Sequence, residues 1–179
     1  THLLLTRWAK ADTEAAFSSL DTANFSLERG HSLSILSALA ALDPKRTANW
    51  LTSPTNTRAY YPIVGHVLSG TIAKEWARQD PQAALEWAQT LTDQQQAGAY
   101  SGVLGTIAAT DPQEAATLAL GLKRGEARDD IFAEIAQSWA RHSPVKALAW
   151  TSTLTPGVRG RATSRALESW SKTHPEKAA

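Results

Sequence analysis

The chain has 179 residues, of which 42% are hydrophobic and 20% are charged, and its formal net charge is +1. This composition is typical of a globular domain with a buried core, and it excludes a disordered or collagen-like chain. No apolar run reaches the about 20 residues that a membrane-spanning helix needs, and the first residues do not have the pattern of a signal peptide. Cysteine is absent, which excludes disulfides and thiolate nucleophiles but leaves the compartment, cytoplasm or periplasm, open.

One pattern recurs along the chain and predicts its architecture. Residues 75–91 and 138–154 match most closely, because both contain Trp-Ala-Arg, then Pro, then Ala-Leu, Trp and Leu at the same positions. Weaker copies give six anchor residues: Thr13, Pro44, Pro81, Pro112, Pro144 and Pro175. The anchors are separated by 31, 37, 31, 32 and 31 residues, so we infer a repeat of about 31 residues with one insertion of about six.

In chain order, each anchor predicts a tight turn at which a second helix begins. The preceding residue is Asp at the first four anchors, then Ser143 and His174. An Asp or Ser side chain accepts a hydrogen bond from a free backbone N–H at a helix start, and Pro at the first helical position loses no needed donor. Upstream and downstream of the anchors, apolar residues recur at spacings of three and four, which indicates an amphipathic helix on each side.

The repeat also assigns the predicted core. A large residue stands five positions before each anchor, at Trp8, Leu39, Trp76, Ile107, Trp139 and Trp170. A second large residue stands six positions after four of the anchors, at Trp50, Trp87, Leu118 and Trp150. All seven tryptophans therefore occupy repeat positions, so we interpret them as core residues and not as a stacking surface for sugars or bases.

Polar turns separate the units at residues 92–94, 123–126 and 155–157, and no segment alternates with the period of a strand. The unit resembles the tetratricopeptide class of helical hairpins, in a divergent form of bacterial type, through Asp80-Pro81 followed by Trp87 and through its recurring alanines. The resemblance implies an all-α fold, a right-handed superhelix or α-solenoid of helix hairpins. We expect residues 1–179 to form a single solenoid domain of about five to six repeats, as part of a longer chain.

Catalytic and cofactor motifs are tested against the same sequence. The glycines at 65–70 and 98–105 lack the Lys of a phosphate loop and the spacing of a dinucleotide fingerprint, and we expect them to let helices approach closely. The five histidines show no metal-binding spacing, and Ser101 does not hold the central position of a nucleophile elbow. Glu168-Ser169 resembles the Glu-Ser pair of soluble lytic transglycosylases, but that family's Gly-Leu-Met-Gln motif is missing. We expect no enzyme activity, no cofactor and no metal.

We expect instead a non-catalytic scaffold that binds a protein or peptide in a groove of the solenoid. The tetratricopeptide resemblance implies that the Asp-Pro helices line this groove. Their residues outside the apolar stripe are Gln82, Glu86, Gln89, Gln113, Lys146 and Ser152. The insertion within residues 52–62 adds Arg58, Tyr60 and Tyr61, residue types favoured at binding hot spots, or is simply a longer connection that covers a hairpin. The alternative function is an accessory superhelical region of a larger enzyme or sensor that binds a small molecule or glycan.

Charge is uneven along the chain. Residues 1–119 hold 8 Lys and Arg against 11 Asp and Glu, whereas residues 120–179 hold 10 against 6. This basic excess is too small for a nucleic-acid footprint, so we expect no nucleic-acid partner. Opposite charge and apolar repeat positions at the two ends predict that the chain can associate with itself through the ends of the solenoid.

Overall fold

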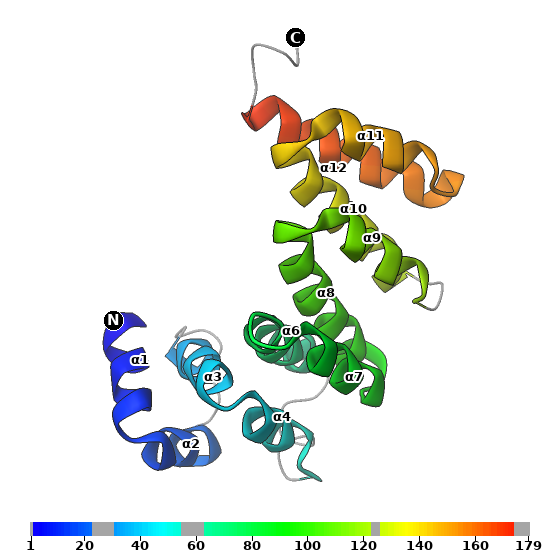
Figure 1. Ribbon diagram of the computed structural model, residues 1–179. Helices are drawn as coiled ribbons and strands as arrows, with labels where there is room; N and C mark the ends of the chain where they lie inside the picture. The colour runs from blue at the N-terminus through cyan, green and yellow to red at the C-terminus, as the bar shows by residue number, and fades with distance from the viewer. Residues whose placement is uncertain (1, 23–30, 55–62, 123–125, 174–179) are drawn as a thin grey trace. The chain divides into compact units, whose positions relative to one another are not determined.

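A computed structural model of the chain describes residues 2–22, 31–54, 63–122 and 126–173 (Figure 1). These residues form eleven helices and no strand, which confirms the all-α class. The chain divides into two compact units, Thr1–Val103 and Leu104–Ala179, with the boundary inside helix α8.

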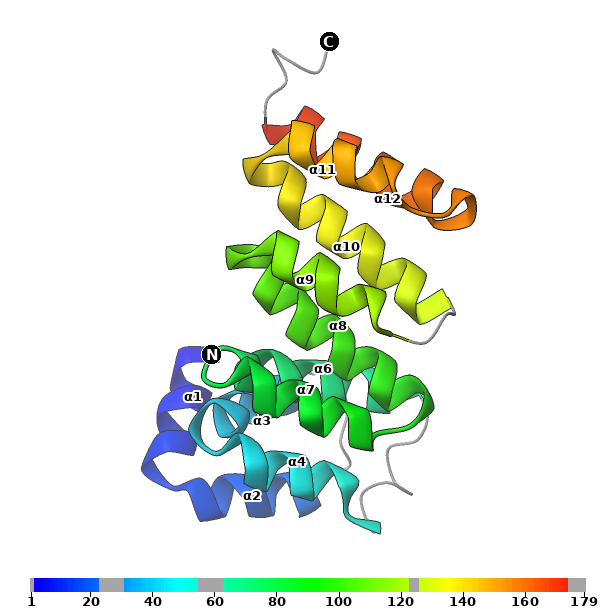
Figure 2. The ribbon, with the colours of Figure 1, turned by 45° about the vertical axis from the view of Figure 1, so that its right-hand side comes forward.

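The described residues of the first unit form six helices and most of a seventh. The helices are α1 (His2–Ala11), α2 (Thr13–Thr22), α3 (His31–Leu42), α4 (Pro44–Thr52), α6 (Ile63–Ala77), α7 (Pro81–Thr90) and the first part of α8 (Asp93–Thr110). Helix α3 packs against α1, α2, α4 and α6, and α6 packs in turn against α4 and α7 (Figures 1 and 2). Consecutive helices therefore lie against each other as hairpins.

The second unit begins with the end of α8 and continues with α9 (Pro112–Leu120), α10 (Glu126–His142), α11 (Pro144–Ser152) and α12 (Pro156–Thr173). Helix α10 packs against α9, α11 and α12, and α11 also packs against α12 (Figure 2). The predicted turn at residues 155–157 is shorter than expected, because α12 already begins at Pro156.

The turns at the anchors have the predicted construction. Single residues, Asp43, Asp111 and Ser143, join α3 to α4, α8 to α9 and α10 to α11. The Asp side chain accepts a hydrogen bond from a backbone N–H in the first turn of the helix that follows, at 2.9 Å for Asp43, Asp80 and Asp111. Ser143 occupies the same position without a side-chain cap bond. The Asp-Pro pairs thus fix where the second helix of each hairpin starts.

Five of the ten predicted core positions are buried, and four are partly exposed: Trp87, Leu118, Trp150 and Trp170. Trp50, Trp76 and Trp139 are at most 9% exposed, and the indole rings of Trp139 and Trp150 lie 5.7 Å apart between centroids. Trp8 departs from the prediction, because it occupies the same repeat position as Trp76 but is 37% exposed. Its helix α1 packs on α2 and α3, whereas α6, which carries Trp76, packs on α3, α4 and α7. Burial of this position thus depends on the neighbouring helices as well as on the repeat.

Helices α6 and α8 approach at backbone distance within the first unit. A Cβ atom added to Gly98 would lie 2.1 Å from the His66 carbonyl oxygen, and one added to Gly102 would lie 2.3 Å from that of Gly70. The Ser69 hydroxyl donates to the Gln95 carbonyl at 2.7 Å across the same crossing. The predicted role of these glycines is confirmed there. It is wrong for Gly105, where an added Cβ meets nothing within 4 Å.

Side chains also bond between helices at regular sequence separations. In the second unit Ser138 donates to Ala108, 30 residues away, and Ser169 donates to Gln137, 32 residues away. Further pairs in the two units are Arg46 with Glu14 at 32, Arg161 with Asp130 at 31, Ser37 with Glu75 at 38 and Gln79 with Ala41 at 38 residues. The separation of 38 occurs for the pairs that bracket the six-residue insertion.

Candidate functional site

The predicted partner-binding residues lie on the exposed sides of three helices that begin at a Pro. All of those on α7, α9 and α11 are exposed: Gln82, Glu86, Gln89, Gln113, Lys146 and Ser152. We call these six residues the Pro-helix face. The opposite sides of the same helices are buried through small residues such as Ala84, Ala88 and Ala115.

The structure brings some of these residues together and separates others. On α7 in the first unit, Gln82 donates to the Glu86 carboxylate at 3.2 Å, and Gln89 follows one turn later on the same side. In the second unit Gln113 lies on α9, and Lys146 and Ser152 lie on α11. Lys146 and Ser152 are six residues apart, so about 120° of helix surface separates them. Arg58, Tyr60 and Tyr61 lie outside the described residues.

The sequence analysis missed two apolar residues on the Pro-initiated helices of the second unit. Val145 is 72% exposed and Leu120 is 54% exposed. Val145 occupies the repeat position of Gln82 and Gln113, and Leu120 occupies that of Gln89. The repeat alignment already contained this information, because a position that is polar in one repeat is apolar in another. Exposed apolar side chains beside polar ones are typical of a contact surface.

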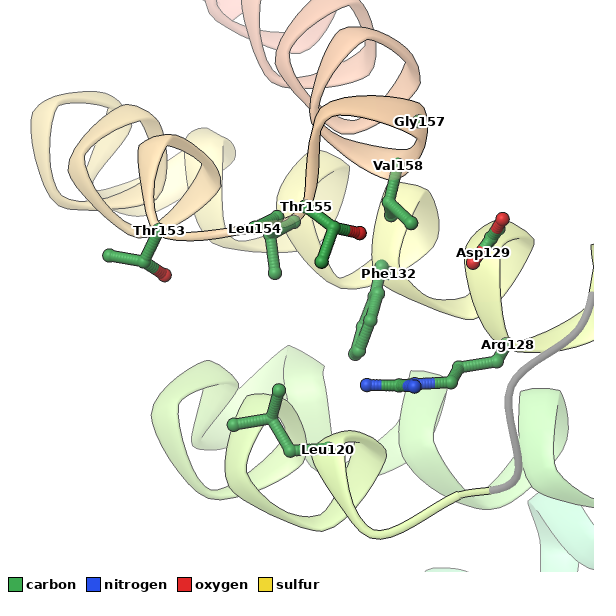
Figure 3. A pocket seen from close by; sticks show the side chains of 9 residues that line it. All are labelled: Leu120, Arg128, Asp129, Phe132, Thr153, Leu154, Thr155, Gly157 and Val158. Atoms are coloured by element: carbon green, nitrogen blue, oxygen red, sulfur yellow. The ribbon is translucent and has the colours of Figure 1, made fainter.

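A cavity of about 460 Å³ lies within the second unit, at the end of α9, the first turns of α10 and the turn into α12 (Figure 3). Its wall is mainly apolar, and the buried part comes from Phe132, Leu154 and Val158. The nine lining residues are Leu120, Arg128, Asp129, Phe132, Thr153, Leu154, Thr155, Gly157 and Val158. The cavity has the size and lining of an ordinary small-molecule site.

Arg128 is the cation of this cavity. Its guanidinium carbon lies 4.8 Å from the centre of the Phe132 ring, which holds the planar group by a cation–π contact. The Nε atom of Arg128 is buried and has no hydrogen-bond partner. A buried donor without a partner costs about 1–3 kcal/mol, so Nε is held there by the packing of the side chain, and only the terminal nitrogens of the guanidinium can meet a ligand in the cavity.

Sequence analysis did not identify this cavity because its lining comes from three separate segments. Arg128 and Phe132 are four residues apart on α10, a spacing that places them on one side of a helix. Leu120 ends α9, and the residues from Thr153 to Val158 form the turn after α11 and the start of α12. Only the packing of α9, α11 and α12 on α10 brings these segments together.

The perturbed carboxylates lie outside the cavity and form surface ion pairs. Glu14 accepts two hydrogen bonds from Arg46, at 2.5 and 2.8 Å, and this hydrogen bonding lowers the pKa of Glu14. Arg46 also lies over the Phe17 ring, 4.1 Å from its centre. The hydrogen bond from Lys172 lowers the pKa of Glu168. Both carboxylates thus remain ionised to a lower pH than usual, which is a structural effect of their partners.

Within residues 2–22, 31–54, 63–122 and 126–173, no helix combines the length and the apolar character that crossing a membrane requires. In the same described part of the chain, no three His, Asp or Glu side chains gather as they would around a metal ion. The chain matches no protein-family model, no curated protein and no solved structure.

Proposed function

We propose that this protein is a non-catalytic scaffold that binds a protein or peptide through the Pro-helix face. The observation that carries the proposal is the pairing of exposed polar and exposed apolar side chains at equivalent repeat positions of α7, α9 and α11. Gln82 and Gln113 are exposed at the position that Val145 fills with an exposed apolar side chain. Within the second unit, a partner that lies along α9 and α11 would cover Val145 and Leu120 and find hydrogen-bonding groups beside them.

We further propose that the hairpins continue as a right-handed solenoid of about 31-residue repeats, related to the tetratricopeptide class. The hydrogen bonds between residues 30–32 apart support this proposal, since each joins a helix to the equivalent helix of the next repeat. Pairs that are 38 apart, such as Gln79 with Ala41, add the length of the insertion. In a solenoid each repeat contacts its neighbours, which gives contacts of this constant separation. End-to-end pairing of such arrays is the self-association that the sequence predicts.

Site-specific photo-crosslinking tests the scaffold proposal. A photoreactive phenylalanine analogue is placed at Gln82 or Gln113 on the Pro-helix face. The controls carry it at Lys74 or Ser164, which are exposed on α6 and α12. We expect the same partner to be captured from the native cell extract through both face positions and not through the controls. Equal capture through all four positions, or none through either face position, would contradict the proposal.

A second candidate function is an accessory helical region of a larger enzyme or sensor that binds a small molecule or glycan. The cavity in the second unit favours it, because its volume and largely apolar wall suit a small ligand. A thermal-shift screen separates the two functions. A ligand that binds only the folded state raises the melting temperature by mass action, whereas a peptide-binding surface has no reason to respond to a small-molecule library.

A further inference from the structure

We propose that the cavity of the second unit binds a small carboxylate-bearing molecule with an apolar body, and that Arg128 is its anion-binding residue. The cavity contains none of the six residues of the Pro-helix face, although Leu120 borders both, and the inference does not rest on the scaffold function. It is carried by the position of Arg128, by the wall of the cavity and by a comparison with the equivalent residues of neighbouring repeats.

Arg128 differs from its repeat equivalents in what it contacts. Gln96, Arg128 and Arg159 each stand 16 positions before the anchor that follows them, which is Pro112, Pro144 or Pro175. Gln96 donates to the Leu91 carbonyl at 2.8 Å, and Arg159 donates to the Leu154 carbonyl through Nε and a terminal nitrogen at 3.1 and 2.9 Å. Both thereby satisfy a carbonyl just after the end of the preceding Pro-initiated helix. The Nε atom of Arg128 makes no such bond and remains without a partner.

The side chain of Arg128 points into the cavity instead. Figure 3 shows its guanidinium extending towards Leu120 on one side of the Phe132 ring. The stacking on Phe132 fixes the plane of the guanidinium, which leaves its N–H edge available to a planar acceptor. Arginine binds carboxylates through two parallel N–H donors, and the two terminal nitrogens at the end that extends into the cavity could bind a carboxylate in this way.

The rest of the wall defines the other half of the ligand. Phe132, Leu154 and Val158 are at most 8% exposed and present apolar surface to the cavity. An aromatic or branched aliphatic group would cover this surface and leave water, while the carboxylate stays on Arg128. A free inorganic anion would leave the apolar wall uncovered, so we expect it to bind more weakly than an apolar carboxylate.

Asp129 allows the sign of the ligand's charge to be tested. It lines the same cavity, on the helix that carries Arg128 (Figure 3). A carboxylate ligand is repelled by Asp129, so Asp129→Asn should strengthen its binding. A cationic ligand would be attracted by Asp129, and the same substitution should weaken its binding.

Two glycines of α12 provide a matched pair of blocking variants. Gly157 lines the cavity and Gly160 does not, and an added Cβ meets nothing within 4 Å at either position. Gly157→Leu should therefore fill the mouth of the cavity without a clash at Cβ, and Gly160→Leu should place the same side chain on the same helix outside it. Arg128→Gln is the second test, because Gln is accepted at this repeat position in Gln96.

The experiment is calorimetric titration of the 179-residue chain with phenylacetate and isovalerate, and with phenylacetamide and phenethylamine as neutral and cationic analogues. We expect the two carboxylates to bind and to raise the melting temperature, and each analogue to bind at least tenfold more weakly. Arg128→Gln should weaken carboxylate binding at least tenfold, and Gly157→Leu should abolish it. Gly160→Leu should leave it unchanged, and Asp129→Asn should tighten it.

Several outcomes overturn the inference. These are no carboxylate binding at millimolar concentration, equal binding of the amide or amine, or binding that survives both Arg128→Gln and Gly157→Leu. Far-UV circular dichroism and the melting temperature of each unliganded variant show whether it is folded, and the Gly157→Leu arm tests the site even where Arg128→Gln unfolds. Crosslinking through Gln82 and Gln113 is scored in a separate assay, so failure of the scaffold function and failure of this inference are distinguishable.

Discussion

The close crossing of α6 and α8 gives the sharpest test of the structure through Gly98→Ala. The new Cβ would lie 2.1 Å from the His66 carbonyl oxygen, 2.7 Å from Ser69 Oγ and 2.8 Å from the His66 carbonyl carbon. Two of these three atoms belong to backbone, which cannot rotate out of the way as a flexible side chain can. The helices must therefore move apart, and the hydrogen bond from Ser69 to the Gln95 carbonyl must lengthen or break.

The expected magnitude follows from three contributions. Overpacking a core contact costs about 1–3 kcal/mol, and the rigid partners at Gly98 favour the upper part of that range. Loss of the Ser69 hydrogen bond costs about 1 kcal/mol, and the higher helix propensity of Ala offsets about 1 kcal/mol. We expect the free energy of unfolding to fall by about 2–3 kcal/mol. At about 2–4 °C per kcal/mol for a chain of this size, the melting temperature should fall by about 4–12 °C.

Gly105→Ala is the matched control, since it makes the same chemical change on the same helix. An added Cβ at Gly105 meets nothing within 4 Å, so the gain in helix propensity is unopposed. We expect Gly105→Ala to stabilise the protein by about 0.5–1 kcal/mol. Thermal and urea unfolding followed by circular dichroism at 222 nm measure both variants. If Gly98→Ala melts at or above the temperature of the parent, α6 and α8 do not cross at Gly98.

Three further predictions concern the core, the helix caps and an ion pair. Trp139→Ala should lower the free energy of unfolding in urea by about 3–5 kcal/mol, because Trp139 is 9% exposed and packs on Trp150. Val145→Ala, at a 72% exposed position, should change it by under about 0.5 kcal/mol. Similar losses for the two variants would place Trp139 outside the core. Asp80→Ala should lower the free energy of unfolding by about 1 kcal/mol, because the cap bond from the Ala83 N–H is lost. Ser143→Ala should lower it by less, because Ser143 makes no side-chain cap bond. Equal losses for the two variants in chemical denaturation would contradict this. The Glu14 carboxyl should titrate by NMR at a lower pH in the parent than in Arg46→Gln, because the Arg46 hydrogen bond lowers its pKa. A depressed folded-state pKa stabilises the folded protein at pH values above the unfolded-state pKa, and this contribution is lost as the pH falls through the folded-state pKa. Identical titration midpoints in the two proteins would show that the pair does not form.

The helices and their turns could be predicted from the sequence because their causes are local. Asp43 and Asp111 cap a helix through atoms two or three residues away, and the following Pro fixes the backbone at the same place. Trp8 shows where this reasoning ends. Its repeat position predicted burial, but the exposed fraction depends on which helices surround α1, and that information is not contained in the residues next to Trp8.

The candidate sites were predictable in part. The exposure of residues such as Gln82 and Lys146 follows from their place opposite the apolar stripe of their helices. The cavity was not predictable, because Arg128 and Leu154 are 26 residues apart and meet only through the packing of α10 with the turn into α12. The 4.8 Å contact between Arg128 and Phe132 is local, yet a basic and an aromatic residue four apart occur on many helices without forming a site.

In a repeat protein, residues that every unit shares are retained by packing, so function is best sought where one unit departs from the others. Gln96 and Arg159 show the structural role of their repeat position, since each donates a hydrogen bond to a carbonyl just after the end of a Pro-initiated helix. Arg128 holds the same position, but its Nε atom gives up that bond, and its guanidinium lies on the Phe132 ring beside an apolar cavity. A fold optimised only for stability would keep the carbonyl bond, because a buried N–H without a partner is destabilising. Arg128 is therefore the place in the second unit where a ligand is best sought, and the titration with carboxylates tests it.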